Sequence, residues 1–335
     1  MLDILCIGDA KLDIFIQVPD DNPHVSLDKK TDKLLISYGE KISVDKHFLD
    51  IGGNAANAAT GISSLGFNAG LCAEIGKDEF SQKILNKLSK KNVNIDYLVQ
   101  QENEETSFSV SVSYKGDRVL FTEHAERKHD FNFENLQTNF VYLTSLGNIW
   151  ENAYKNVLDF VESKKIKFAF NPGTLQLEKR DNLVFEVIEK TDYLFVNKEE
   201  AQELLYGKEL GLEREENNNS LIKKMLFGLK GLGAKNVIIT DSQNGSYVQD
   251  EKNDIYYLGI LNEKIVEKTG AGDSYTAGFL AAILNGLPIT DAMVWGTINA
   301  ASVVKKIGAQ DGLLTKEQIE EKIKSLKNFT PEKLI

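Results

Sequence analysis

The sequence has few cysteines and no long apolar run. Its two cysteines, Cys6 and Cys72, lie in apolar segments typical of buried strands. This pattern argues against a disulfide framework and favours core thiols in a reducing compartment. No segment approaches the roughly 18 apolar residues of a membrane span, and the N-terminus lacks the basic and apolar regions of a signal peptide. We therefore expect a cytoplasmic protein whose fold begins near Met1.

Positive charge is also in deficit, with 39 Lys and Arg against 50 Asp and Glu and a net charge of −11. Nucleic acids and anionic membranes would be repelled, so neither is expected as a partner. A small anionic ligand remains compatible, because clustered amides and one lysine reverse the field inside a cleft. The histidines form no metal-ligand pattern and are interpreted as surface residues, namely His24, His47, His124 and His129.

Two common nucleotide-binding motifs are missing. The nearest approach to a P-loop, Gly70–Lys77, has one residue too many and is followed by aspartate. The segment Gly8–Asp13 lacks the second and third glycines of a dinucleotide fingerprint. These absences argue against P-loop chemistry and hydride transfer.

Strand-like apolar runs alternate with helix-patterned segments, which is typical of a mostly parallel sheet covered by helices. We expect one α/β domain over residues 1–335, with a helical C-terminal third and a capping box at Thr315–Gln318. The expected strands are Ile4–Ile7, Ala69–Ala73, Phe140–Leu143, Lys167–Phe170, Tyr193–Val196 and Val237–Thr240. The expected helices are Gly272–Gly286, Thr290–Lys306 and Thr315–Leu326.

Two segments, about 13–50 and 105–124, instead alternate polar and apolar residues in the manner of half-exposed antiparallel strands. We expect them to form a small β-sheet lid over a cleft. Such a lid would exclude water from a reaction, and its exposed face would suit a homodimer contact. The polar stretch Glu213–Asn219 is expected to be a solvent loop.

The strongest motif is Thr269–Tyr275, which contains two glycines and opens a helix rich in small residues. Its backbone amides and the helix N-terminus would form an anion site. Asp273 would then lie in the first helical turn, where an ionised carboxylate can accept the proton of an attacking hydroxyl. The alternative is an ordinary glycine turn followed by a helix-capping aspartate.

A second motif is Gly52–Ala59, in which two glycines leave room for a ligand near the backbone. Asn54 and Asn57 are three residues apart, so they fall on one helical face and can serve sugar hydroxyls as donors and acceptors. The alternative is an alanine-rich helix packed on the sheet, with Asn54 as its N-cap.

These two motifs, in this order and more than 200 residues apart, resemble the paired signatures of the ribokinase-like (PfkB) carbohydrate kinase family. The resemblance implies a ribokinase-like fold and ATP-dependent phosphorylation of a sugar hydroxyl, with Mg²⁺ as the metal. Asp273 matches the general base, and the amides of Gly270, Ala271, Gly272 and Asp273 match the family's anion hole. Asp13, Gly52, Gly53 and Asn57 match its acceptor-binding residues.

Other segments extend the resemblance along almost the whole chain. Asn197–Glu200 is similar to the family's magnesium and phosphate element, with Glu200 at the metal, although it is also a capping box. Thr240–Gly245 resembles the nucleotide-contacting turn, although Asn244 and Gly245 also predict a hairpin. Asn299 and Gly308–Gln310 are similar to the nucleotide-flanking helix and loop, which gives Asn197, Thr240, Gly245 and Asn299 as expected nucleotide contacts.

The chain departs from the family pattern at two places. Ser242 replaces a glycine in the nucleotide turn, and Glu267-Lys268 replaces Asp-Thr in a region that helps bind a monovalent cation. We therefore expect weak or absent potassium activation.

The nature of the acceptor stays open at this point. Phe108 or Val110 of the lid are expected to contact it, and the lid shows no aromatic pair for stacking a base, which favours a sugar. The alternatives are a nucleoside kinase of the same family and a non-catalytic protein that senses a sugar or nucleoside.

Overall fold

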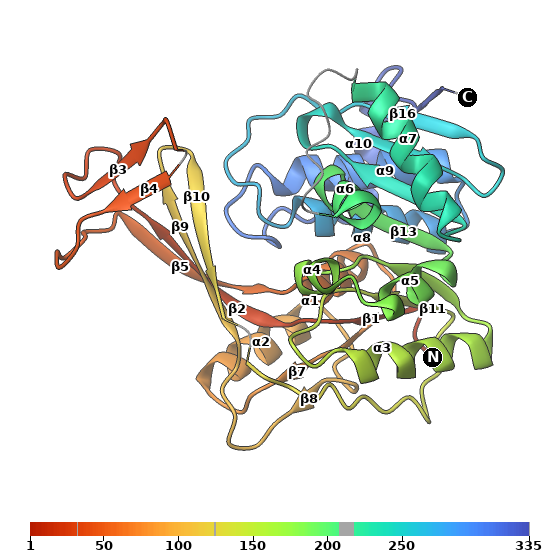
Figure 1. The fold of residues 1–335 in the computed structure, drawn as a ribbon, viewed down its shortest axis with the longest axis horizontal. Helices are drawn as coiled ribbons and strands as arrows, with labels where there is room; N and C mark the ends of the chain where they lie inside the picture. The colour runs from red at the N-terminus through yellow and green to blue at the C-terminus, as the bar shows by residue number, and fades with distance from the viewer. Residues whose placement is uncertain (32, 124, 208–217, 335) are drawn as a thin grey trace.

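The structure, a computed structural model, describes residues 1–31, 33–123, 125–207 and 218–334. Its largest element is a nine-stranded sheet, parallel from β6 to β14 and extended by three antiparallel strands (Figure 1). In spatial order its strands are β17 (Glu332–Lys333), β16 (Ile255–Leu258), β15 (Ser246–Gln249), β14 (Asn236–Thr240), β13 (Tyr193–Asn197), β12 (Lys167–Phe170), β11 (Phe140–Leu143), β1 (Ile4–Ile7) and β6 (Ala69–Cys72). Each expected strand is present, with ends that agree within one residue.

Helices cover both faces of this sheet, because alternate residues of its central strands are apolar on both sides. In β1, Leu5 and Ile7 belong to one core, whereas Ile4 and Cys6 belong to the other. The first core contains α3 (Glu151–Lys164), α4 (Thr174–Lys179), α5 (Asn182–Glu189), α6 (Lys198–Tyr206) and α7 (Asn218–Gly231). The second contains α1 (Asn54–Ser64), α2 (Glu79–Lys90), α8 (Ala271–Leu284), α9 (Ile289–Val303) and α10 (Lys316–Ser325). The expected α/β architecture is confirmed.

Local sequence signals set several of these element ends. The expected capping box begins α10, where the Thr315 hydroxyl accepts from the Gln318 amide. Both cysteines are buried free thiols, as predicted. Most of the predicted loop at 213–219 lies outside the described residues, and α7 starts at Asn218. Within the described part of the chain, no helix combines the length and apolarity needed to cross a membrane.

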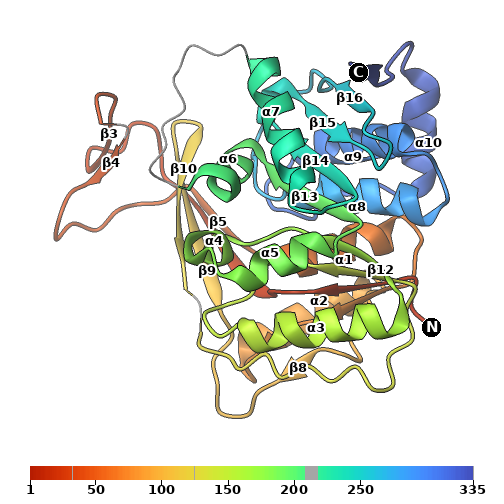
Figure 2. The same cartoon turned by 45° about the vertical axis from the view of Figure 1, so that its right-hand side comes forward.

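A second, four-stranded sheet projects from the side of the large one (Figures 1 and 2). Its strands come from the two segments predicted for the lid, although β2 starts at Lys11 and β5 ends at Gly52. The β2–β9 pairing is parallel, and the other two pairings are antiparallel. The order is β10 (Asp117–Thr122), β9 (Phe108–Tyr114), β2 (Lys11–Gln17) and β5 (Lys46–Gly52). Two further pairs are β3 (Val25–Asp28) with β4 (Lys33–Ile36), and β7 (Glu74–Ile75) with β8 (Val99–Gln100).

The register of the small sheet determines which side chains share a face. Asp13 on β2 lies opposite Asp50 on β5 and Ser109 on β9, so all three side chains occupy one face. We call this the inner face of the small sheet, because its residues contact the C-terminal loop 308–310 and the loop before α8. The small sheet therefore meets the large domain where the parallel strands have their carboxyl ends, the usual position of an α/β ligand site.

Candidate active site

The N-terminus of α8 has the backbone geometry of an anion site. Gly270 is its N-cap with φ 77°, a conformation that favours glycine, and a side chain there would lie 2.4 Å from the Cβ of Ala309. The Ala271 amide donates to the Lys268 carbonyl at 3.3 Å. Helix geometry leaves the amides of Gly272 and Asp273 without an intrahelical acceptor, so they can bind an anion.

Asp273 is the third residue of α8, as the motif predicted, and it contacts the second motif directly. The Asn57 side chain donates to Asp273 Oδ2 at 2.8 Å, and Gln310 donates to Asn57 Oδ1 at 3.1 Å. Residues 216 positions apart in sequence therefore form one hydrogen-bonded chain. Because both ends of the Asn57 amide are engaged, its clearest role in this structure is to position Asp273.

Gly53 allows helix α1 to start close to the chain that follows strand β1. Gly53, with φ 94°, is the N-cap of α1, and a Cβ on it would lie 2.3 Å from the Asp9 carbonyl oxygen. The alternative in which Asn54 caps this helix is therefore wrong, since Asn54 is the first helical residue. Only glycine permits both this φ and this contact.

The electrostatics of Asp273 suit a base. Loss of hydration raises the pKa of Asp273 to about 6, the Asn57 hydrogen bond opposes this rise, and the nearby Asp13 carboxylate adds to it. Such a carboxylate is ionised near neutral pH and yet more basic than an exposed aspartate. This is the balance that a proton acceptor requires.

A cavity of about 230 Å³ lies against the α8 N-terminus, and we call it the α8 cavity. It contains most of the predicted phosphate, nucleotide and metal residues. Among its lining residues are Asn54, Asn171, Asn197, Glu200, Thr240, Lys268 and the run Gly270–Asp273. Lys268 also lines this cavity, and a lysine beside clustered amides makes the local field favourable to an anion in an otherwise acidic chain.

Glu200 lies at the first turn of α6, where the predicted capping box is present. Asn197 accepts from the Glu200 amide, and the Glu200 carboxylate accepts from the Asn197 amide at 2.9 Å. Loss of hydration raises the pKa of Glu200 to about 7, although its bonds to Asn197 and Asn171 oppose the rise. A cation beside this carboxylate would favour its ionised form. Among the described residues no cluster of three potential metal ligands exists.

Asp13 lies on the inner face of the small sheet and is buried. The Ser109 hydroxyl donates to Asp13 Oδ1 at 2.5 Å, and a Cβ on Gly52 would overlap the Asp13 carboxylate. Burial raises the pKa of Asp13, and the Ser109 bond opposes this rise. Gly52 is thus required to leave room for the carboxylate that the family resemblance placed at the acceptor.

The lid predictions need two corrections. Phe108 and Val110 alternate with Ser109, so they point to the face opposite Asp13, and Phe108 packs edge-on against Phe80 of α2. The lid also does contain an aromatic pair, because Phe15 and Phe48 stack across β2 and β5 with ring centroids 4.5 Å apart. The β2–β5 pairing brings together residues that are 33 positions apart in the sequence. The alternation of polar and apolar residues within each strand does not reveal which residues pair across the two strands.

Two of the expected nucleotide residues lie away from the α8 cavity lining. Gly245 ends the loop between β14 and β15, which form the predicted hairpin. The turn of this hairpin also includes Ser242–Asn244, so it is longer than the predicted Asn244-Gly245 turn. Ser242, where the family has glycine, keeps the left-handed conformation with φ 46°. Asn299 is fully buried and joins the Ser274 carbonyl to the Leu314 amide, so here it supports α8 from behind.

Several residues of the site region were not predicted. The Arg118 guanidinium, on the inner face of the small sheet, forms an ion pair with Glu267, whose carboxylate also accepts from the amides of Lys268 and Thr269. Lys87 of α2 pairs similarly with Asp50. His129 is buried, so its interpretation as a surface residue is wrong. His124 lies outside the described residues. Of these residues, only Glu267 was noticed in the sequence, because Glu267-Lys268 departs from the family pattern.

A family model of pfkB carbohydrate kinases matches residues 20–316. The chain belongs to this family. It is 27% identical over 331 residues to a nucleoside kinase of Methanocaldococcus jannaschii, covering 96% of both chains. It is 22% identical to a 5-dehydro-2-deoxygluconokinase of Bacillus subtilis, covering 82% of this chain and 87% of the relative. The predicted small-molecule kinase class is thereby confirmed.

The fold has solved counterparts. The structure of an Arabidopsis thaliana ribokinase complexed with ribose and ATP superimposes with a TM-score of 0.75 at 19% identity, covering 96% of this chain and 98% of that one. The predicted ribokinase-like fold, with its large mostly parallel sheet and small second sheet, is therefore confirmed.

Proposed function

We propose that this pfkB kinase transfers the γ-phosphoryl group of ATP to a hydroxyl of a sugar, with Asp273 as the general base. The hydrogen bond between Asp273 and Asn57 carries the proposal, because it joins the α8 anion site to the α1 motif in one site. A carboxylate at a helix N-terminus lies beside the bound phosphate, where it can accept the proton of an attacking hydroxyl.

In the proposed reaction the acceptor hydroxyl gives its proton to Asp273 as its oxygen bonds to the γ-phosphorus, and the bond from that phosphorus to ADP breaks. The amides from Gly270 to Asp273 stabilise the charge that develops on the transferred group, although the Ala271 amide must first leave the Lys268 carbonyl. Mg²⁺ would neutralise the phosphates of ATP, and Glu200 would hold it.

The nucleotide would extend from the α8 cavity past Asn197 and Thr240, which line it. Gly245 would close the turn beside it, and Asn299 would act by supporting α8. The four-stranded sheet would act as a lid, since Arg118 and Asp13 reach the site from its inner face. Asp13, Gly52, Gly53 and Asn57 would form the acceptor side.

A nucleoside is the second candidate for the acceptor. The stacked pair of Phe15 and Phe48 lies on the inner face of the small sheet and lines a separate cavity of about 330 Å³. That cavity could hold an aromatic base, and the M. jannaschii relative is a nucleoside kinase. A sugar- or nucleoside-sensing protein without turnover is the third candidate, and the basic character of Asp273 argues against it.

We also propose a homodimer formed through the lid and a cytoplasmic location. Leu49 and Phe121 point to the face opposite Asp13 and are 43% and 55% exposed, which gives that face an apolar surface suited to a second copy. The buried free thiols of Cys6 and Cys72 fit a reducing compartment.

The proposal is tested by ATP consumption with a panel of alcohols comprising D-ribose, D-fructose, 5-dehydro-2-deoxygluconate, fructose 6-phosphate, adenosine and cytidine. Asp273→Asn should lower turnover by about 10²–10⁴-fold and leave acceptor binding largely intact, because it removes one positioned base. Asp159→Asn, an equal charge change at an exposed position of α3, is the control. Equal turnover in wild type and Asp273→Asn would remove Asp273 from the mechanism.

A further inference from the structure

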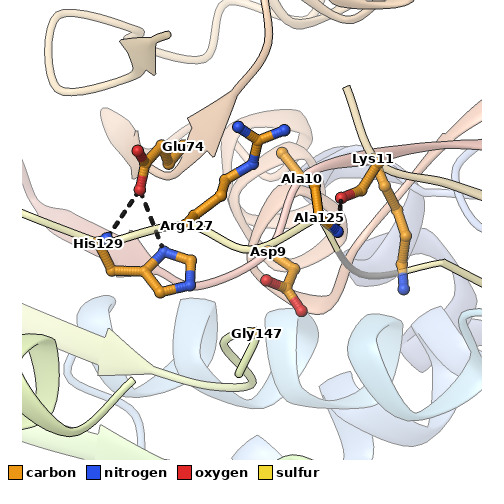
Figure 3. A pocket seen from close by; sticks show the side chains of 9 residues that line it. Asp9, Ala10, Lys11, Glu74, Ala125, Arg127, His129 and Gly147 are labelled. Carbon is orange, nitrogen blue, oxygen red and sulfur yellow. Dashed lines mark hydrogen bonds and ion pairs between the residues drawn. The ribbon is translucent and has the colours of Figure 1, made fainter. Parts of the chain in front are cut away.

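A third pocket lies beside the acceptor side, beneath the segment that follows the lid (Figure 3). It has a volume of about 10 Å³, the space of a single water-sized group. We call it the His129 pocket, and its lining includes Asp9, Lys11, Glu74, Arg127, His129 and Gly147. Figure 3 shows the Asp9 carboxylate and the His129 ring extending toward Gly147.

His129 is held there in an unusual state. Its backbone has φ 50°, which is rare outside glycine, and its side chain is only 4% exposed. Neither ring nitrogen has a hydrogen-bond partner among the described residues, and Nδ1 lies 3.5 Å from a Glu74 carboxylate oxygen as a long ion-pair contact. Buried polar atoms are normally bonded, and left-handed backbone at a non-glycine residue is costly, so the combination indicates a site that binds something.

Glu74 fixes the position of this ring through the backbone. The Glu74 carboxylate accepts from the His129 amide at 2.8 Å and from the Gln101 side chain. The ring itself packs against Phe131, with centroids 5.8 Å apart. The orientation of the imidazole is therefore set by neighbours that place Nδ1 beside the Glu74 carboxylate and leave Nε2 available to a ligand.

The charge balance of the pocket favours an uncharged group. Burial lowers the pKa of His129, so its neutral ring offers one donor and one acceptor. The Arg127 guanidinium is already engaged by the Glu104 carboxylate at 2.8 Å and by the Glu105 carbonyl. Two carboxylates, Asp9 and Glu74, and two cations, Lys11 and Arg127, line the same space, so the lining carries no net charge that would favour an ionic group. A hydroxyl group, which both donates and accepts, matches this environment.

The His129 pocket adjoins the acceptor side through β2. Lys11 lines the pocket and Asp13 lies two residues further along the same strand, so their side chains share one face about 6–7 Å apart. Both residues act electrostatically on Asp273. The Asp9 carbonyl also contacts Gly53 at the start of α1. A molecule the size of a monosaccharide, with one hydroxyl beside Asp273, would therefore bring another hydroxyl near His129.

We propose that the His129 pocket is an acceptor subsite that binds one uncharged hydroxyl of the molecule being phosphorylated, through the Nε2 atom of the His129 ring. This inference rests on the proposed kinase function and deepens it, since it selects neutral polyols and discriminates against a phosphate or carboxylate at that end of the acceptor. His129 is then a specificity-determining residue, distant from the base itself.

Two variants test the subsite independently. His129→Phe keeps an aromatic ring and the backbone bond to Glu74 but removes both nitrogens. Gly147→Ala leaves His129 in place and adds a methyl 3.4 Å from its Nε2, an ordinary contact that the fold accommodates while it fills the pocket. Gly231→Ala is the matched control, because nothing lies within 4 Å of a Cβ at this exposed helical position.

The same six-alcohol panel is then assayed with these variants. For the best neutral acceptor, we expect KM to rise roughly tenfold in His129→Phe and Gly147→Ala, with kcat and the KM for ATP within about twofold of wild type. If neither KM changes while Asp273→Asn is inactive, the subsite is wrong and the proposed function stands. If fructose 6-phosphate is preferred over fructose and its KM rises in both variants, the pocket binds an anion and the inference is overturned.

A binding measurement separates the subsite from catalysis. The ring signals of His129 are assigned in ¹⁵N-histidine spectra of the full chain without ATP, because they are lost in His129→Phe. A neutral acceptor should shift these signals, and Gly147→Ala should abolish the shift. If wild type consumes no ATP with any panel member, the proposed function fails, and these spectra with D-ribose, D-fructose and adenosine still decide the subsite. No shift with any of the three would overturn it.

Discussion

On the α8 side of the site, most of the groups that would meet a phosphate are backbone amides of one short segment, held by Gly270 and by a helix end, and the Lys268 side chain is beside them. The small-sheet side instead presents side chains from separate strands, such as Asp13 and Ser109, that bond to one another. Backbone groups cannot be exchanged by substitution, whereas side chains can. The difference implies that the α8 side fixes the chemistry and the small-sheet side adjusts the choice of acceptor.

After the loss of Asp273 itself, the largest effect should come from disturbing the backbone of the α8 side. Gly270→Ala combines a left-handed φ with a Cβ 2.4 Å from that of Ala309, so the first turn of α8 must move. We expect kcat/KM for ATP to fall roughly 100-fold, as when an anion-stabilising donor is lost. The control Gly286→Ala has the similar φ of 75° with nothing within 4 Å, so it should cost about 1 kcal/mol of stability and leave kinetics intact. Equal kinetics in the two variants would break the comparison.

The next effect concerns the contact between the two motifs. Because the proposed base must be ionised and the pKa of Asp273 in the ligand-free protein is about 6, kcat/KM for the acceptor should decline as pH falls through about 6. The bond from Asn57 lowers that pKa, so Asn57→Ala should move the decline to higher pH and reduce kcat/KM at pH 6 roughly tenfold, with a smaller loss at pH 8. Profiles of kcat/KM against pH measure this.

Gln310→Met is the control for Asn57→Ala, since it removes the other hydrogen bond of Asn57 and leaves the one to Asp273. Its pH profile should match wild type. A shift of the same size in both variants would mean that general disorder of α1, and not the direct bond, governs the basicity of Asp273.

A smaller effect is expected on the small-sheet side. Ser109→Ala removes the hydroxyl that holds Asp13 at 2.5 Å, and it should raise KM for the acceptor about 3–10-fold without changing KM for ATP. Ser111→Ala is a close control, because Ser111 is buried on the same face of β9 and its hydroxyl has no partner among the described residues. An effect on kcat alone would contradict the division between the two sides.

The α8 side of the site is easier to predict from the sequence than the small-sheet side. The 269–275 and 52–57 motifs can be interpreted from the sequence because their glycines and polar residues act within one helical turn, and the structure joins them through Asn57 and Asp273. The pairing of Phe15 with Phe48 and the burial of His129 depend on strand register and on a packed segment. Such contacts between distant residues leave no periodic pattern within a short window, so the sequence did not reveal them.

The smallest effect is expected for potassium, where a long-range contact meets a local sequence departure. The Glu267 carboxylate pairs with Arg118, 149 positions away, so a guanidinium already supplies positive charge where the family resemblance places a monovalent cation. At fixed ionic strength, replacing sodium by potassium should change wild-type turnover by less than about twofold, since the carboxylate is neutralised. Arg118→Met should create a larger potassium response, because it leaves Glu267 buried without its cation. A strong specific stimulation of the wild type, unaltered in Arg118→Met, would show that the cation binds elsewhere and that the small sheet contributes nothing to the charge of the α8 side.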